Sequence, residues 1–224
     1  YCKKKNLPSI SLTDRNNLFG SLEFSIISTH HGIQPIIGVV LTIKYQNYYK
    51  IDHNNLGDII LLTKNHIGYF NLIELITEYY INNKKYLQYV KISSLLIKAK
   101  GLIIICGQYG SPLEKLFYNN KISLAKDLLK ILKYTFKQNF FLEISRNVDN
   151  IFNKIYENFV LNISINMSIP MVATNQTQYL EENQFKILDF LLCIINYKYV
   201  IEKKRIKASK YNFLYTIKNI RNLF

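Results

Sequence analysis

The sequence predicts an α/β fold in which strands and helices alternate along the chain. Short runs rich in β-branched residues, of which Ile36 to Ile43 is the clearest, are separated by segments whose apolar residues recur three and four positions apart. No hairpin signal joins these runs, so we expect parallel strands with right-handed crossovers. With 224 residues, 49% of them hydrophobic, the chain can bury the core of one domain.

The first strand and the first helix are predicted between residues 8 and 32. Pro8 to Leu12 alternates like a short buried strand, and Leu18, Leu22 and Ile26 then mark the apolar side of a helix. Asp14 lies between the two elements. A single carboxylate in that place is more often a helix N-cap than a metal ligand.

Further strands and helices continue the alternation. The expected strands are Ile59–Leu62, Leu102–Cys106 and Phe140–Ile144. The expected helices are Gly68–Ile76, Ser123–Phe136 and Val148–Ile163. Asn82 to Tyr89 is polar and aromatic and is expected to form a loop. Gly107 to Gly110 is expected to be a turn, because it lacks the G-K-[ST] sequence of a phosphate-binding loop.

The net charge of +14 leaves two interpretations open. A basic surface attracts nucleic acid, because neutralising phosphates supplies most non-specific affinity. Only four of the 29 basic residues are arginine, however, and Lys, Asn, Ile and Tyr are abundant throughout, as drift toward A+T-rich codons would produce. The best local candidate for a phosphate contact is the cluster Lys203, Lys204, Arg205 and Lys207, which is otherwise a solvated charged segment.

The cysteines and the hydropathy pattern indicate a reduced, cytoplasmic protein. Cys2, Cys106 and Cys193 lie far apart and show no C-x-x-C spacing, so neither a disulfide framework nor a zinc site is predicted. The most apolar stretches are much shorter than the roughly 20 residues of a membrane-spanning helix, and no signal peptide is recognisable.

One motif resembles a known family. The stretch from Thr13 to Phe24, T-D-R-N-N-L-F-G-S-L-E-F, is similar to the second motif of the PHP domain of bacterial DNA polymerase III alpha subunits, especially alphaproteobacterial ones. The segments around Lys64-Asn65, Pro170 to Asn175 and Phe190 to Ile194 also resemble that family in order. This resemblance implies a strand at Pro170–Asn175 and a helix at Glu181–Ile195. The resemblance implies a PHP-type distorted (β/α)7 barrel, with residues 1–224 forming a single domain.

The resemblance also implies that the chain is part of a longer protein. The family's H-x-H strand would precede Tyr1, so we expect the first strand of the barrel to be missing. The parent implied is a DNA-directed DNA polymerase, a nucleotidyltransferase, whose palm domain would follow Phe224. The 224 residues alone are therefore not expected to extend DNA.

The family's metal ligands are replaced in this sequence. Mapping the motifs places the ligand positions at Arg15, Val40, Asn147, Gln176 and Gln178, and none of these five side chains is a competent ligand. Asp14 alone is retained. We therefore expect no metal, no cofactor and no catalytic residue.

Three functions remain as hypotheses. The first is a structural domain that docks the proofreading exonuclease and other replicase subunits during DNA replication, with weak, non-specific DNA binding and no membrane contact. The alternative is an active, metal-dependent phosphoesterase of the PHP superfamily. The third is a basic adaptor that binds nucleic acid.

Overall fold

The computed structural model describes residues 1–45, 55–81, 87–146 and 151–224, with the side chains of residues 151–153 excepted. Its strands are β1 Ser9–Arg15, β2 Gln34–Lys44, β3 Leu56–Thr63, β4 Val90–Lys91, β5 Leu102–Cys106, β6 Phe140–Ile144 and β7 Met171–Ala173. Its helices are α1 Ser21–His30, α2 His66–Ile81, α3 Ile92–Ile97, α4 Pro112–Tyr118, α5 Ile122–Phe136, α6 Ile151–Met167, α7 Phe185–Ile195 and α8 Ile217–Leu223.

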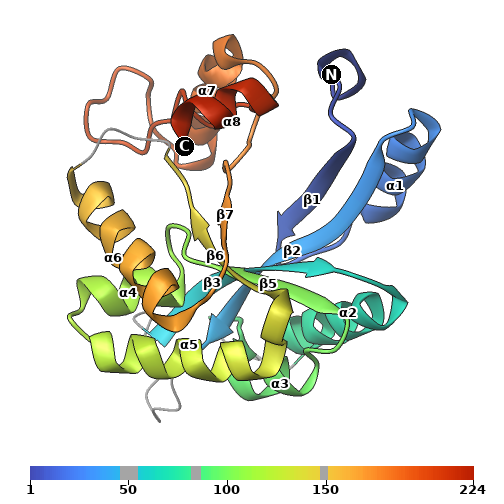
Figure 1. The fold of residues 1–224 in the computed structure, drawn as a ribbon. Coiled ribbons are helices and arrows are strands. Elements are labelled where there is room, and N and C mark those ends of the chain that lie inside the picture. The colour runs from blue at the N-terminus through green and yellow to red at the C-terminus, as the bar shows by residue number, and fades with distance from the viewer. Residues whose placement is uncertain (46–54, 82–86, 147–150) are drawn as a thin grey trace.

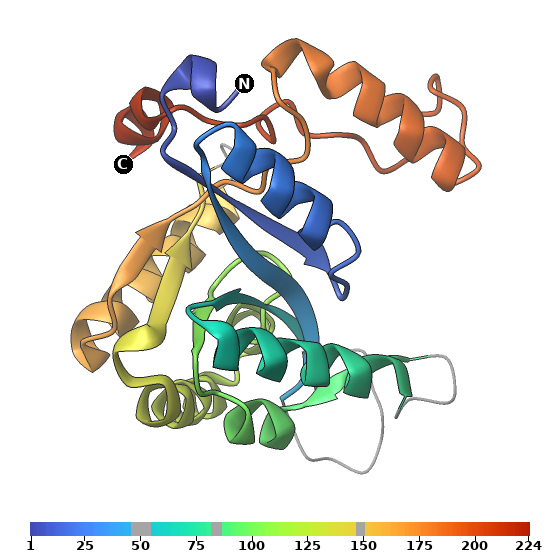
Figure 2. The ribbon, with the colours of Figure 1, turned by 90° about the vertical axis from the view of Figure 1, so that its right-hand side faces the viewer.

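The strands form one mixed sheet that curls into a half-barrel (Figures 1 and 2). The strand order is β1-β2-β3-β5-β6-β7. The two-residue strand β4 pairs in parallel with the C-terminal end of β2. Helices α2, α3, α4 and α5 lie along one side of the sheet (Figure 1). The α/β prediction is confirmed in the coarser form of a mixed sheet that curls into a half-barrel and carries helices.

One prediction about the sheet is wrong, because the strands are not all parallel. β3 runs antiparallel to both of its neighbours, β2 and β5, whereas β1–β2, β5–β6 and β6–β7 are parallel. A parallel crossover needs a dozen or more residues, usually a helix. Lys44 and Leu56 are too close in sequence for that unit, so the chain reverses instead.

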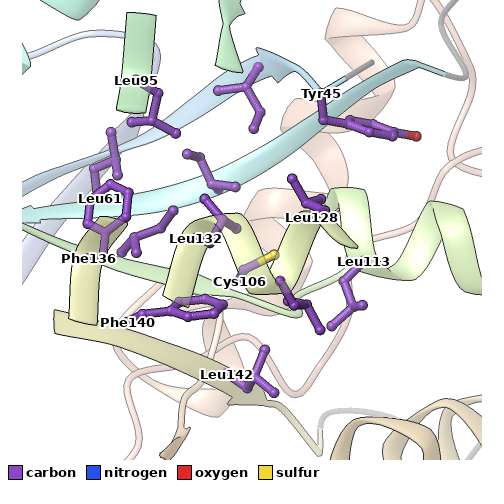
Figure 3. Packing of buried hydrophobic residues seen from close by; sticks show 14 of the residues in the cluster. Tyr45, Leu61, Leu95, Cys106, Leu113, Leu128, Leu132, Phe136, Phe140 and Leu142 are labelled. Atoms are coloured by element: carbon purple, nitrogen blue, oxygen red, sulfur yellow. The ribbon is translucent and has the colours of Figure 1, made fainter. Parts of the chain in front are cut away.

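The hydrophobic core lies between the sheet and its helices. Along β2 the side chains of Val39, Leu41 and Ile43 are fully buried against the helical side, and the alternate residues face the concave side. Figure 3 shows the same pattern in β5 and β6, where Cys106, Phe140 and Leu142 meet Leu128, Leu132 and Phe136 of α5. The concave face carries the alternate residues of the strands, both apolar ones such as Val40 and Ile60 and polar ones such as Thr42 and Asp58.

The first helix differs from the prediction. It begins at Ser21, later than the apolar pattern indicated, and it ends at His30, before Gly32. The side chains of Leu22 and Ile26 are 73% and 62% exposed, so these residues do not form the buried side of α1. No other element of the described structure packs against Leu22 and Ile26, although they follow helical spacing.

The other predicted elements are confirmed with shifted bounds, and several short ones were not predicted. Helix α6 begins at Ile151, and the start predicted for it at Val148 falls outside the described residues, as do residues 82–86 of the predicted loop. The predicted helix Glu181–Ile195 divides into a 3₁₀ turn, Glu182–Gln184, and the α-helix α7. Strand β4 and helices α3, α4 and α8 are too short to give a periodic signal.

The turn after β5 requires its glycine. Gly107 has a φ of +136°, and a Cβ at this position would lie 2.8 Å from the carbonyl oxygen of Glu143 on β6. Gly107 therefore lets the end of β5 approach β6 closely.

The two ends of the chain meet beyond the sheet. The hydroxyl of Tyr1 donates to the carbonyl of Leu214 at 3.3 Å, and Tyr179 pairs with Phe213 in an isolated bridge. Helix α8 begins at the Thr216 capping box. The segment after β7 thus packs back toward the start of β1 (Figure 2).

Candidate functional site

The candidate site lies on the concave face of the sheet, where β1 and β2 end and β3 begins. Arg15 ends β1, and its guanidinium forms an ion pair with the carboxylate of Asp58 on β3. Asp58 is largely buried, with its side chain 12% exposed, while the side chain of Arg15 is 63% exposed. The hydroxyl of Thr42 on β2 donates to the other carboxylate oxygen at 2.8 Å. The Asp58 carboxylate therefore links β1, β2 and β3.

Asn16 completes this network. It has a φ of +57°, a left-handed conformation that asparagine tolerates better than most residues. Its side-chain oxygen accepts from the backbone N–H of Thr42 at 2.8 Å, and its amide nitrogen lies 3.0 Å from the hydroxyl of Tyr79 on α2. The buried amide fixes the end of β1 against β2, where its own backbone N–H donates to Val40.

Asp14 lies inside β1 and does not cap a helix, so the capping prediction is wrong. Helix α1 starts seven residues later with Gly20 as its N-cap, and no side chain in the described structure caps it. The intervening residues form a bend in which Asn17 accepts from the backbone N–H of Phe19. Asp14 remains a half-buried carboxylate on the strand.

The other positions mapped from the family motifs are spread over the sheet. Val40 is the register partner of Arg15, so these two positions are neighbours. Gln176 and Gln178 follow β7 at the opposite edge of the sheet, where both are exposed and Gln178 pairs with Asn212. Asn147 lies outside the described residues. The part of the chain that the structure describes holds no group of three or more His, Cys, Asp or Glu side chains that could bind a metal.

A second polar group occupies the ends of β5, β6 and β7. The side chain of Glu143 on β6 is buried, and one of its oxygens accepts from the hydroxyl of Thr174, which follows β7. The other oxygen has no hydrogen-bond partner in the described residues. Burial raises the pKa of Glu143 to about 7, and the hydrogen bond from Thr174 lowers it in part.

The neighbouring thiol is not reactive. Burial raises the pKa of Cys106 to about 12, which leaves almost no thiolate at neutral pH. Helix α4 begins beside it, with Ser111 as N-cap and the carboxylate of Glu114 accepting from the backbone N–H of Gly110 at 2.6 Å. Burial raises the pKa of Glu114 as well. These groups secure the turn after β5 and offer no nucleophile.

The basic cluster near the C-terminus is only partly available to a ligand. The guanidinium of Arg205 forms a bidentate pair with Asp189 on α7 at 2.7 Å for both bonds, and its side chain is 5% exposed. This pair holds the pKa of Asp189 down at about 2. Arg205 is thereby removed from the predicted phosphate contact, whereas Lys203, Lys204 and Lys207 remain exposed.

Sequence reasoning missed most of the interacting residues. Asp58 is an acidic residue within the apolar run Leu56–Thr63, and that contrast was the available signal for a polar role on the concave face. Glu143 interrupts the apolar strand Phe140–Ile144 in the same way. Neither pattern identifies the partner, which comes from another strand.

Residues 1–147 match the family described as PHP domain. DNA polymerase III subunit alpha of Rickettsia bellii is 32% identical over 189 residues, which are 84% of this chain and 16% of that protein. The same subunit of Rickettsia prowazekii is 33% identical over 84% of this chain and 15% of its own length. That of Buchnera aphidicola from Acyrthosiphon pisum is 30% identical over 98% of this chain and 19% of its own length.

The chain thus spans less than a fifth of the length of these relatives. No helix in the described residues is long and apolar enough to cross a bilayer.

Proposed function

The chain belongs to the PHP domain family, and from this premise we propose that it is a structural docking domain of a replicative DNA polymerase III alpha subunit. In this role it holds the proofreading exonuclease beside the polymerase in the cytoplasm and carries out no catalysis itself. The named relatives support the connection to replication. Since the chain spans a small part of each relative, no polymerase activity is proposed for it.

The proposal treats residues 1–224 as one domain, although the family match ends at residue 147. Two contacts support a single unit. Strand β7 pairs with β6 inside the same sheet, and Tyr1 at the start of the chain bonds to Leu214 near its end.

The observation that carries the proposal is the ion pair between Arg15 and Asp58. A PHP metal centre needs oxygen and nitrogen donors around cations, and here the positive charge of Arg15 pairs with the buried carboxylate of Asp58. A metal ion bound at this place would meet electrostatic repulsion from the guanidinium and would lose Asp58 as a ligand. Val40, the strand neighbour of Arg15, offers no donor atom. The proposed role is therefore structural.

An exposed apolar surface on α7 supports docking. Ile187, Phe190, Leu191, Ile194 and Ile195 recur at the spacing of one helix face and are each at least 49% exposed. In a helix packed on a core this face would be buried. Its exposure favours a protein partner. The opposite side of α7 does pack inward, through Cys193 and the Asp189–Arg205 pair.

Lysines border the apolar α7 face. Lys186 and Lys198 flank it in sequence and are exposed. A complementary partner surface would therefore have an apolar centre and an acidic border.

Co-purification tests the docking proposal. We expect the chain to retain the exonuclease subunit of the same genome at physiological salt, and the double variant Phe190→Asp/Ile194→Asp to lose it. The matched control is Leu22→Asp/Ile26→Asp on α1, which changes two residues of similar exposure on another helix. Equal binding by the wild type and both variants would show that α7 is not the docking surface. Absence of exonuclease binding to the wild type, with DNA binding retained at the same salt, would favour the basic adaptor.

A further inference from the structure

We infer that a basic hollow between α5 and the end of α6 binds single-stranded DNA. The hollow has a volume of about 680 Å³ and is lined by Lys130, Lys133, Tyr134, Lys137, Asn166 and Ser168, with Met167 at its wall. Helix α5, which supplies most of the lining, lies away from α7 (Figure 1). The inference is independent of the docking role, because no residue of the α7 face takes part.

Helix geometry places the basic residues together. At 3.6 residues per turn, Lys130, Lys133 and Tyr134 fall within about 100° of the circumference of α5. Lys137 follows the last residue of the helix as its C-cap. All four side chains are exposed. The C-terminal half of α5 and its C-cap residue therefore present three positive charges near one aromatic ring.

The positive charge of the hollow is only partly compensated. Asp127 pairs with Lys130 at 3.3 Å, and the ammonium of Lys133 donates to the backbone carbonyl of Met167 at 2.5 Å. Lys137 has no ion pair in the described part of the chain. The Lys133 bond satisfies a carbonyl at the C-terminus of α6, which also fixes the side chain in the hollow. Each ammonium has three donors, so all three lysines retain N–H groups for phosphate oxygens.

The aromatic ring indicates a single strand rather than a duplex. The side chain of Tyr134 is 84% exposed, next to the lysines. Single-stranded nucleic acid is bound by basic grooves that follow the backbone and by aromatic rings on which unpaired bases stack. Bases in a duplex are already stacked and do not reach such a ring. Asn166 and Ser168 add exposed polar groups on the side of α6. The DNA polymerase relatives make DNA the nucleic acid of choice for the test.

The test measures the affinity of the 224-residue chain for a labelled oligo-dT by fluorescence anisotropy at several salt concentrations. The variant Lys130→Gln/Lys133→Gln/Lys137→Gln should reduce the slope of log affinity against log salt by about 2, because single-strand binding contributes about 0.7 per phosphate neutralised. The matched control Lys3→Gln/Lys4→Gln/Lys91→Gln removes the same net charge from three exposed lysines elsewhere and should change the slope much less.

Further variants separate the effect of lysine charge on DNA binding from effects on folding and on base stacking. Lys130→Gln/Lys137→Gln leaves the Lys133 bond to α6 intact and should still lower the slope by about 1.4. Tyr134→Ala should weaken oligo-dT binding roughly tenfold, and Tyr134→Phe should keep it, because stacking requires the ring and not the hydroxyl. The inference is overturned if both triple variants lose affinity equally, or if duplex DNA competes as well as the single strand.

Discussion

Glu143 should make the folded protein less stable as pH rises through neutrality. Its ordinary pKa is 4.5, and burial raises the pKa to about 7 in the folded state. The unfolded chain loses this proton near pH 4.5, whereas the folded chain keeps it until about pH 7. Because the folded state binds more protons between these values, the free energy of unfolding decreases with pH across that window.

The size of the effect follows from the shift. At about 1.4 kcal/mol per pKa unit, a rise from 4.5 to about 7 corresponds to roughly 3 kcal/mol of stability lost between pH 4.5 and pH 8. Replacing Glu143 by Gln removes the titration and keeps an oxygen that can accept from Thr174. The Gln amide adds a constant cost, because one oxygen of Glu143 has no partner among the described residues. The quantity to measure is therefore the pH dependence of the difference in unfolding free energy between the wild type and Glu143→Gln.

Urea unfolding followed by circular dichroism between pH 4 and pH 9 measures this difference. We expect the stability of wild type relative to Glu143→Gln to fall by about 3 kcal/mol over the window. Thr174→Val supplies a directional control. Removing the hydrogen bond that lowers the pKa of Glu143 should move the midpoint of the fall to higher pH. A difference that stays constant with pH would refute the reasoning and show that Glu143 is solvated.

Three further predictions concern the metal, the ion pair and the turn. The purified chain should bind no stoichiometric Zn²⁺, Mn²⁺ or Mg²⁺ and hydrolyse no phosphoester, and elemental analysis finding two or more tightly bound metals per chain would favour the phosphoesterase alternative. Restoring donors with Arg15→His, Val40→Glu, Gln176→Asp and Gln178→His should raise the affinity for Mn²⁺ if the motif mapping is right. Arg15→Ala should lower the free energy of unfolding in urea by about 1–3 kcal/mol, because it leaves the Asp58 carboxylate buried without its cation. Lys98→Ala should lower it by less than about 1 kcal/mol, because the side chain of its partner Glu74 is 59% exposed. Gly107→Ala should lower stability by about 1–3 kcal/mol through strain at positive φ and contact with the Glu143 carbonyl, and it should cost more than Gly32→Ala, where a Cβ meets open space.

The strands of this protein could be predicted from the sequence because their signal is local. Runs such as Ile36 to Ile43 and Phe140 to Ile144 consist of residues that favour extended backbone, and the structure places β2 and β6 there. The side chains at Arg15 and Val40 are also readable directly, and their assignment to metal-ligand positions stays a prediction from the resemblance. The resemblance carried by Thr13 to Phe24 gave the family, which the match over residues 1–147 confirms.

The tertiary structure decided which groups meet. The reversal of β3, the pairing of Arg15 with a residue 43 positions away, and the burial of Glu143 beside Thr174 all depend on how distant segments fold back on one another. Local periodicity marks the apolar side of a helix but not whether another element covers it, so the exposure of α1 and α7 could not be read from their sequences. Local backbone preferences determine the elements, and the long-range packing of the sheet determines the chemistry of its concave face.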